Sequence, residues 1–231
     1  MEGDSEMRPK TVGLVTYHYP HLKTEQVVQR LVQQRYDYTM YALPFTPRKA
    51  RKTLFVHRPE QSDAVAPQSM AAKHKMPYIV CANDTEIAHD CEVYLVLGAG
   101  ILSDACVAGK KIINCHPGII PSSRGLDSFK WALYEMKPLG VTLHYIDSQV
   151  DCGEIIAIVP TNVYATDSLA TLARRHYENE IDCLCRFEEL LNSPQNPFVG
   201  IEPGEAKRRM SLGTEKDLAR LFSEYTEKYG R

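Results

Sequence analysis

The chain has 231 residues, of which 44% are hydrophobic and 24% are charged, an ordinary globular composition. Its formal net charge of −2 argues against a dedicated nucleic-acid binder, because such proteins carry an excess of Lys and Arg. No apolar run approaches the roughly 20 residues that cross a bilayer, and the N-terminal MEGDSEMRPK lacks an apolar signal segment. We therefore expect a cytoplasmic protein that binds neither nucleic acid nor membrane. The seven cysteines include no CxxC pair, so neither a zinc ribbon nor a thioredoxin-type redox site is indicated.

The first half of the chain alternates strand-like and helix-like segments. Strands are predicted at 11–17, 38–45, 76–81, 111–116 and from 92 to the glycines at 98 and 100, where β-branched and aromatic residues gather. Helices are predicted between them at 24–35, 65–74 and 103–108, and Asn83 and Asp84 offer a cap for a turn. Strands separated by helices pair in parallel. The pattern predicts an α/β fold with a Rossmann-like, mostly parallel sheet and helices on both faces.

The second half breaks this alternation. Two strand-like runs, 139–146 and 153–164, follow each other closely, which predicts an antiparallel extension of the sheet. A long amphipathic helix is predicted at 168–191 and a last helix at 214–228, separated by a Pro- and Asn-rich linker. We therefore expect a catalytic domain at 10–191 and a short helical tail, 192–231, that packs on it.

A polar pair stands at the end of the predicted strand 111–116. Asn114 and His116 are two residues apart, so their side chains project to the same side, whereas Cys115 points to the opposite face. Ligands of open α/β sheets bind outside the carboxyl ends of the strands. Asp151 lies in a second, glycine-bounded loop. A histidine that takes a proton, an aspartate that orients it and an asparagine that donates to an oxyanion would suit acyl transfer.

At these residues the sequence resembles a known family. The stretch NCHPGIIPSSRGLDSFKWAL followed by GVTLHYIDSQVDCGEII is similar to the catalytic core of the folate-dependent formyltransferases. The family pattern is Asn-x-His-Pro, a later Gly, and then His with Asp seven residues beyond it in an Asp-x-Gly loop. Here it falls on Asn114, His116, Pro117, Gly125, His144, Asp151 and Gly153.

The resemblance implies a formyltransferase fold, with Asn114, His116 and Asp151 as the catalytic residues. It also implies N10-formyltetrahydrofolate as the co-substrate that donates the formyl group, with no metal. The residues expected to bind this folate are Leu97, Gly98, Ala99, Gly100, Ile101, Leu102, His144, Asp147 and Val150. His144 reads equally well as a pocket residue and as a hydrogen-bonded core histidine.

The acceptor amine is the less certain half of the reaction. The purine-pathway enzymes carry a glycine-rich phosphate loop after the first strand, where this chain has TYHYPHLK, and the tRNA enzymes carry an added C-terminal barrel. The chain therefore looks most similar to the sugar-nucleotide N-formyltransferases, among them those acting on GDP-perosamine for lipopolysaccharide O-antigen. A GDP- or dTDP-linked amino sugar would then be the small-molecule partner. The expected substrate contacts are Tyr17, His18, Arg48, Lys52, Pro117, Gly118, Arg124 and Asp127.

Several alternatives stay open. The basic run 48–52 reads as a solvated surface or as a clamp on a diphosphate. Tyr17, His18 and Tyr19 could stack on substrate or simply pack, and Arg208 and Arg209 read as a charged turn. Glycinamide ribonucleotide as acceptor, hydrolysis of formyl-folate, and a degenerate fold that only binds ligand are the competing functions. A homodimer is also left open.

Overall fold

The computed structural model describes residues 9–47, 51–147, 153–198, 200 and 202–231. Within them, one mixed sheet has the strand order β3-β2-β1-β4-β5-β7-β8. The strands β1 to β5 pair in parallel, and β7 and β8 extend the sheet in antiparallel fashion. Their bounds are Thr11–Tyr17 (β1), Asp37–Leu43 (β2), Tyr78–Val80 (β3), Val93–Val96 (β4), Ile112–His116 (β5), Gly140–Tyr145 (β7) and Ile155–Pro160 (β8). The predicted parallel sheet and its antiparallel extension are confirmed.

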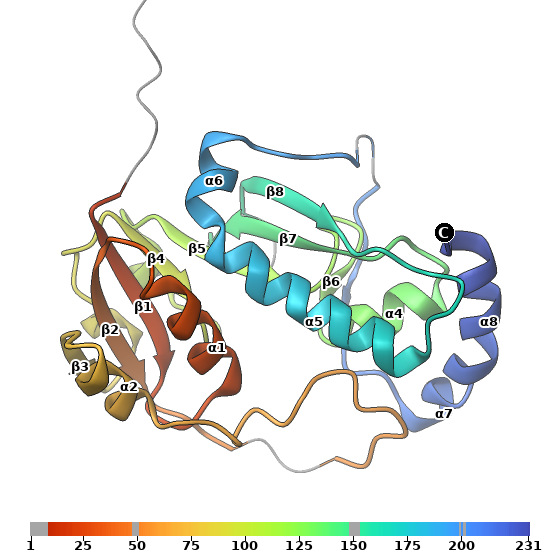
Figure 1. Ribbon diagram of the computed structural model, residues 1–231, viewed down its shortest axis with the longest axis horizontal. Coiled ribbons are helices and arrows are strands. Elements are labelled where there is room, and N and C mark those ends of the chain that lie inside the picture. The colour runs from red at the N-terminus through yellow and green to blue at the C-terminus, as the bar shows by residue number, and fades with distance from the viewer. Residues whose placement is uncertain (1–8, 48–50, 148–152, 199, 201) are drawn as a thin grey trace, which may run out of the picture.

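Helices cover both faces of this sheet, as predicted. One face packs against α1 (Leu22–Leu31), α2 (Pro67–Lys73), α5 (Leu169–Cys185) and α6 (Phe187–Asn192). Figure 1 shows α1 and α5 side by side on this face. The other face carries the 3-10 helix η1 (Asp84–Glu86) and α3 (Asp104–Val107) over a second apolar cluster. None of the described helices is both long and apolar enough to cross a membrane.

Local signals explain where several helices start. Ser168 and Thr171 form a reciprocal capping box at the start of α5, so the helix begins where its orphan N–H groups find acceptors. Ser103 caps α3 and Asn83 caps η1 in the same way. The predicted helix 168–191 is wrong in one respect: the chain breaks at Arg186 into α5 and α6.

The chain reverses direction across the sheet at β1. It runs outward from β1 to β2 and β3, then returns to β4 on the other side of β1. The loops after β1 and β4 therefore diverge and leave a crevice at their carboxyl ends, the usual ligand position in such sheets. Tyr17 closes β1, Leu97 follows β4 and His116 closes β5, so these three predicted site residues stand at the same edge of the sheet.

The C-terminal segment packs against a helix that the sequence did not predict. This helix, α4 (Ser128–Tyr134), is too short for a periodic signal. A two-residue strand β9 (Ala206–Lys207) pairs with β6 (Arg124–Gly125), while α7 (Leu212–Glu215) and α8 (Leu218–Tyr229) follow. Phe129, Leu218 and Tyr225 share one buried cluster, and α8 lies beside α4 (Figure 1). The tail thus helps to form the surroundings of residues 116–130.

Candidate functional site

A cavity of about 840 Å³ opens at the carboxyl end of β5. Asn114 and His116 both line it, and so does Cys115, which the strand alternation predicted to point to the opposite face. The other walls come from residues 51–58, from 125–130, from one face of α5 and from 206–210. The cavity is large enough for a small organic ligand.

His116 is buried and held by the loop that follows it. Its Nε2 lies 2.8 Å from the Ser123 carbonyl oxygen and 3.1 Å from the Ser128 hydroxyl. A carbonyl only accepts, so Nε2 carries the hydrogen and the lone pair of the neutral ring sits on Nδ1. In the neutral tautomer that this bond selects, Nδ1 is the nitrogen left to act as a base.

Gly118 makes this arrangement sterically feasible. A Cβ at this position would lie 2.7 Å from the Ser123 carbonyl oxygen and 2.9 Å from His116 Nε2, so any larger residue would displace the ring. Thr142 of β7 fixes the same loop, since its hydroxyl donates to the Gly118 carbonyl over 2.7 Å. The Ile120–Pro121 peptide in this loop is cis. The Pro117 and Gly118 positions thus serve the geometry of His116, and Pro117 also lines the cavity.

Asn114 is paired with His144 across β5 and β7. Its Nδ2 lies 3.3 Å from His144 Nε2, and His144 Nδ1 is 2.9 Å from the Tyr145 carbonyl oxygen. The carbonyl requires a hydrogen on Nδ1, so Nε2 accepts from the Asn114 amide and fixes which way that amide points. His144 is buried and is absent from the described residues lining the cavity. His144 is therefore a core residue that orients the Asn114 side chain.

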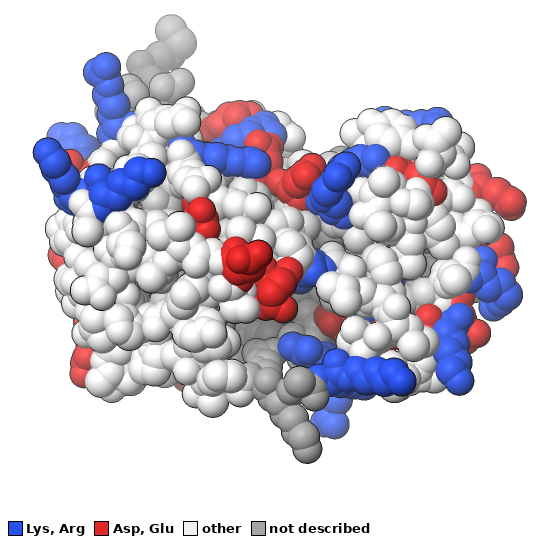
Figure 2. Space-filling view, turned by 60° about the horizontal axis from the view of Figure 1, so that its bottom comes forward, with Lys and Arg blue, Asp and Glu red and all other residues white. Residues whose placement is uncertain are grey.

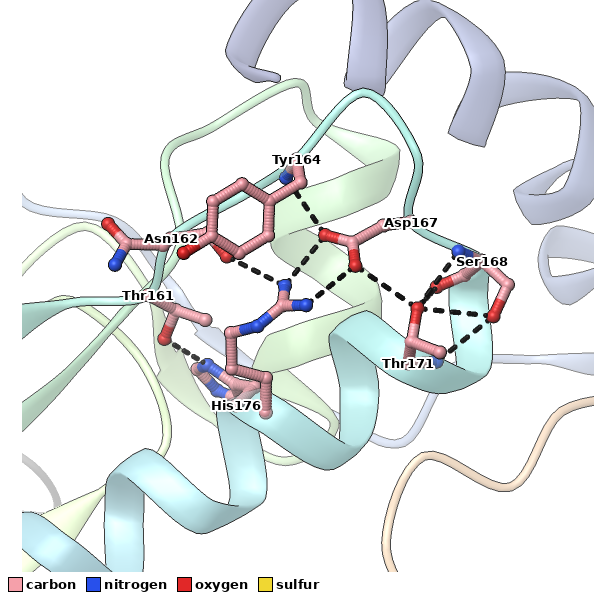
Figure 3. Close-up of polar contacts among 8 residues, drawn as sticks. Thr161, Asn162, Tyr164, Asp167, Ser168, Thr171 and His176 are labelled. Carbon is pink, nitrogen blue, oxygen red and sulfur yellow. Dashed lines mark hydrogen bonds and ion pairs between the residues drawn. The ribbon is translucent and has the colours of Figure 1, made fainter. Parts of the chain in front are cut away.

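His176 on α5 holds the loop that follows His116. Its Nε2 donates to the Pro117 carbonyl at 3.2 Å and its Nδ1 accepts from the Thr161 hydroxyl at 2.9 Å. Figure 3 shows Thr161 pointing at His176, one turn beyond the polar cluster of Asp167, Ser168 and Thr171 at the start of the helix. Burial lowers the pKa of His176 to about 4, so this bridge is neutral at physiological pH.

A second cavity, of about 590 Å³, lies beside the first at the crevice between β1 and β4. Leu97, Gly98 and Ala99 line it, together with Tyr17 and Tyr19, and Ala99 and Asn114 border both cavities. Gly100 and Ile101 continue along the first cavity, and Ile101 is 84% exposed, an unusual state for a large apolar side chain. Leu102 is buried beneath them. The predicted folate segment 97–102 therefore runs along the site.

Some predicted substrate contacts lie elsewhere. His18 turns away and hydrogen-bonds the Tyr78 hydroxyl at 2.7 Å, and Tyr19 stacks on Phe45. The basic run reaches the cavity through Arg51, whereas Lys52 is exposed and absent from the described lining residues. Arg48, Val150 and Asp151 fall outside the described residues. Asp147 is exposed and, like Arg124 on β6, is absent from the described cavity lining.

Asp127 lines the cavity but also has a structural contact. Its Oδ2 accepts from the Met210 backbone N–H over 3.0 Å, which ties the C-terminal segment to the start of α4. Asp127 adopts a left-handed conformation with φ of 56°, uncommon for any residue except glycine, asparagine and aspartate.

The cavity wall contains a buried charge cluster that the sequence did not predict. Glu180 of α5 pairs with Lys23 of α1 at 2.8 Å and with Arg58 at 2.9 Å. Although burial alone would raise the pKa of Glu180, Arg58 and Lys23 lower it to about 2, so the carboxylate stays charged. A signal was available, because His176 and Glu180 are polar residues on the otherwise apolar stripe of α5. Figure 2 shows the hollow between the two halves of the molecule, bordered by acidic and basic side chains.

Parts of the chain are similar in sequence to known proteins. The family model described as formyl transferase matches residues 66–187, more than half of the chain. The chain belongs to the formyl transferase family. It is 35% identical over 95 residues to a phosphoribosylglycinamide formyltransferase of Bacillus subtilis, covering 38% of this chain and 49% of that protein. It is 34% identical over 71 residues to a dTDP-4-amino-4,6-dideoxyglucose formyltransferase of Mycobacterium bovis, covering 31% and 30%. The match thus spans about half or less of these relatives.

Solved structures of this family share the fold over nearly the whole chain. A sugar N-formyltransferase from Shewanella superposes with a TM-score of 0.58 at 17% identity, covering 91% of this chain and 87% of that one. The formyltransferase PseJ from Anoxybacillus kamchatkensis, in complex with a UDP-linked formamido sugar and tetrahydrofolate, gives 0.53 at 18% identity, covering 93% and 99%. The formyltransferase fold predicted from the sequence is confirmed, tail included.

Proposed function

We propose that this chain transfers a formyl group from N10-formyltetrahydrofolate to the amine of a nucleotide-linked amino sugar. The observation that carries the proposal is the pairing of Asn114 and His116, both oriented by hydrogen bonds, on one wall of the 840 Å³ cavity. The site also offers room for two ligands side by side, because Ala99 and Asn114 border both cavities.

The transfer needs one base and one oxyanion donor. The acceptor amine attacks the formyl carbon, the carbon–N10 bond breaks, the amine loses a proton and N10 gains one. His116 would take the amine proton on its lone-pair nitrogen and return it to N10. The Asn114 amide would donate to the oxygen that becomes negative in the tetrahedral intermediate. We assign Asp151, which follows β7, the role of stabilising the protonated imidazole.

The residues that line the crevice between β1 and β4 support this class of acceptor. Tyr17 ends β1, and the residues after it that border the second cavity are Tyr19, Pro20, His21 and Lys23, with no glycine loop to wrap a phosphate. Aromatic side chains there suit a sugar or a base instead. The Mycobacterium relative is named for a dTDP-linked amino sugar and the Shewanella structure for a sugar, which supports this class. A GDP- or dTDP-linked amino sugar for surface polysaccharide is our specific expectation.

The test is a panel assay read by mass spectrometry. Purified chain and formyl-tetrahydrofolate are incubated with GDP-, dTDP- and UDP-linked amino sugars, with glycinamide ribonucleotide, or with no amine. We expect formylation of a sugar nucleotide. Preferred formylation of glycinamide ribonucleotide would overturn the acceptor class, and release of formate at equal rates without any amine would mark the chain as a hydrolase.

A further inference from the structure

The C-terminal segment 206–210 forms part of the cavity wall next to the base. Its backbone is fixed at three points: β9 pairs with β6, the Trp131 indole donates to the Arg208 carbonyl over 2.8 Å, and Met210 N–H donates to Asp127. All three contacts use main-chain atoms of the segment. The side chains of Arg208 and Arg209 are exposed and line the cavity.

Gly125 shows that this docking is specific. The residue has φ of +83°, and a Cβ there would lie 2.3 Å from the Lys207 carbonyl oxygen. Only glycine accommodates both the left-handed conformation and the close approach of β9. The tail segment is thus built into the wall that begins just after the His116 loop.

Three arginines on this wall have no acidic partner among the described residues. Arg51, Arg208 and Arg209 are exposed and line the cavity, and no ion pair joins any of them to a described carboxylate. The other Lys and Arg residues of the lining each have a carboxylate partner: Lys23 and Arg58 share Glu180, Lys130 pairs with Glu215, and Lys207 lies 2.5 Å from Glu135. These three arginines therefore leave positive charge on the cavity wall of a chain whose total charge is −2.

We propose that Arg51, Arg208 and Arg209 form the site that binds the diphosphate of the acceptor. The guanidinium group donates two parallel hydrogen bonds to a phosphate, so three of them suit two adjacent phosphates. Arg209 borders both cavities, so a diphosphate bound here leaves the attached sugar room to reach Asn114 and His116. This inference rests on the proposed function for its ligand, although anion binding can be measured without catalysis.

Calorimetry on the full chain tests the site without folate. GDP, inorganic pyrophosphate and orthophosphate are titrated separately into the wild type, Arg51→Ala, and the Arg208→Ala/Arg209→Ala double variant. Arg220→Ala is the matched control, because Arg220 is an exposed arginine of α8 that pairs with Glu224 at 2.9 Å. Alanine keeps every main-chain contact of the segment, so melting temperatures should stay close to that of the wild type.

We expect GDP to bind about tenfold or more weakly to the double variant and to Arg51→Ala, and normally to Arg220→Ala. Pyrophosphate should bind more tightly than orthophosphate, since two phosphates engage more of the arginines. Equal binding of the two inorganic ions would mean a phosphate-monoester site and overturn the diphosphate assignment. Unchanged GDP affinity in the double variant would overturn the site itself.

The anion site and the proposed function can be refuted independently of each other. Loss of GDP binding in the double variant, with no formyl transfer to any amine, leaves the anion site standing and the function refuted. Formyl transfer to a sugar nucleotide with an unchanged KM in the double variant leaves the function standing and the anion site refuted.

Discussion

His116 owes its orientation to backbone groups of its own loop. The Ser123 carbonyl fixes its tautomer and Gly118 leaves room for the ring, so the base is preorganised before any ligand binds. Asn114 is fixed separately, by His144 on the neighbouring strand. The two groups therefore depend on different supports, and their variants should behave differently.

We predict that His116→Ala lowers kcat by about 100-fold or more, the usual contribution of a general base. Asn114→Ala should lower kcat by roughly 100- to 1000-fold, because its amide would bond most strongly in the transition state. Steady-state kinetics with the accepted sugar nucleotide measure both. His89→Ala is the control, because His89 is exposed and is absent from the described lining of both cavities. Near-normal kcat in both variants, with normal folding, would remove them from the site.

His176 should make stability depend on pH. Burial lowers its pKa from 6.5 to about 4 despite the hydrogen bond to the Pro117 carbonyl, which acts in the opposite direction, so the unfolded chain binds its proton first as the pH falls. Stability is thus full above about pH 6.5 and is lost toward pH 4. The loss from this residue should reach about 2 kcal/mol at pH 5.

The measurement is urea unfolding at pH 7.5 and pH 5 for the wild type and His176→Gln. Burial also lowers the pKa of His21 to about 4 and that of His57 to about 3, so the wild-type loss includes their shares. The difference between the two proteins isolates His176. Equal losses in the wild type and the variant would contradict a neutral, buried His176.

Among the elements, α4 and α7 depend on one buried ion pair. Lys130 and Glu215 contact each other with side chains that are 2% and 1% exposed, and Glu215 also accepts from the Leu54 N–H at 2.7 Å. The pair therefore joins α4, α7 and the segment that brings Arg51 to the cavity. The cation–carboxylate contact lowers the pKa of Glu215 against the effect of burial.

We predict that Glu215→Gln destabilises the fold by about 3–5 kcal/mol, because Lys130 is left as an uncompensated buried charge. Denaturant unfolding measures it. Glu224→Gln removes a surface pair with Arg220 and should cost less than about 1 kcal/mol. The double variant Lys130→Met/Glu215→Leu should recover most of the loss, since no charge is left unpaired. A double variant as unstable as Glu215→Gln would show that packing, and not charge, is responsible.

Over the whole molecule, the charges balance globally but not at the site. The total of −2 provides little long-range attraction for an anionic substrate, whereas the arginines of the cavity act at short range. The sheet positions His116 at the end of β5, and the C-terminal segment 206–210 lines the cavity beside it.

We predict that the KM of the sugar nucleotide rises about fivefold between roughly 0.05 M and 0.5 M NaCl, because salt screens exposed guanidinium groups. The kcat should change little, since His116 and Asn114 are held by hydrogen bonds inside the protein, which salt screens much less than exposed charges. Initial rates across the salt series provide the measurement. A KM that is independent of salt would speak against charge-based recognition of the acceptor.

The sequence alone determined the sheet and the position of two site residues. Apolar runs such as 11–17 and 111–116 form strands whatever surrounds them, and the i, i+2 spacing places Asn114 and His116 on one side of β5. The α5 capping box is equally local. These features depend on neighbours a few residues apart, so they could be read directly from the chain.

Only the tertiary structure decided how distant residues complete the site. Lys23 meets Glu180 across 157 residues, Lys130 meets Glu215 across 85, and β9 returns to pair with Gly125. No local periodicity encodes such contacts, because each arises from the packing of whole elements. For that reason Arg208 and Arg209, which read as a charged turn in the sequence, become cavity residues once the tail folds back onto α4.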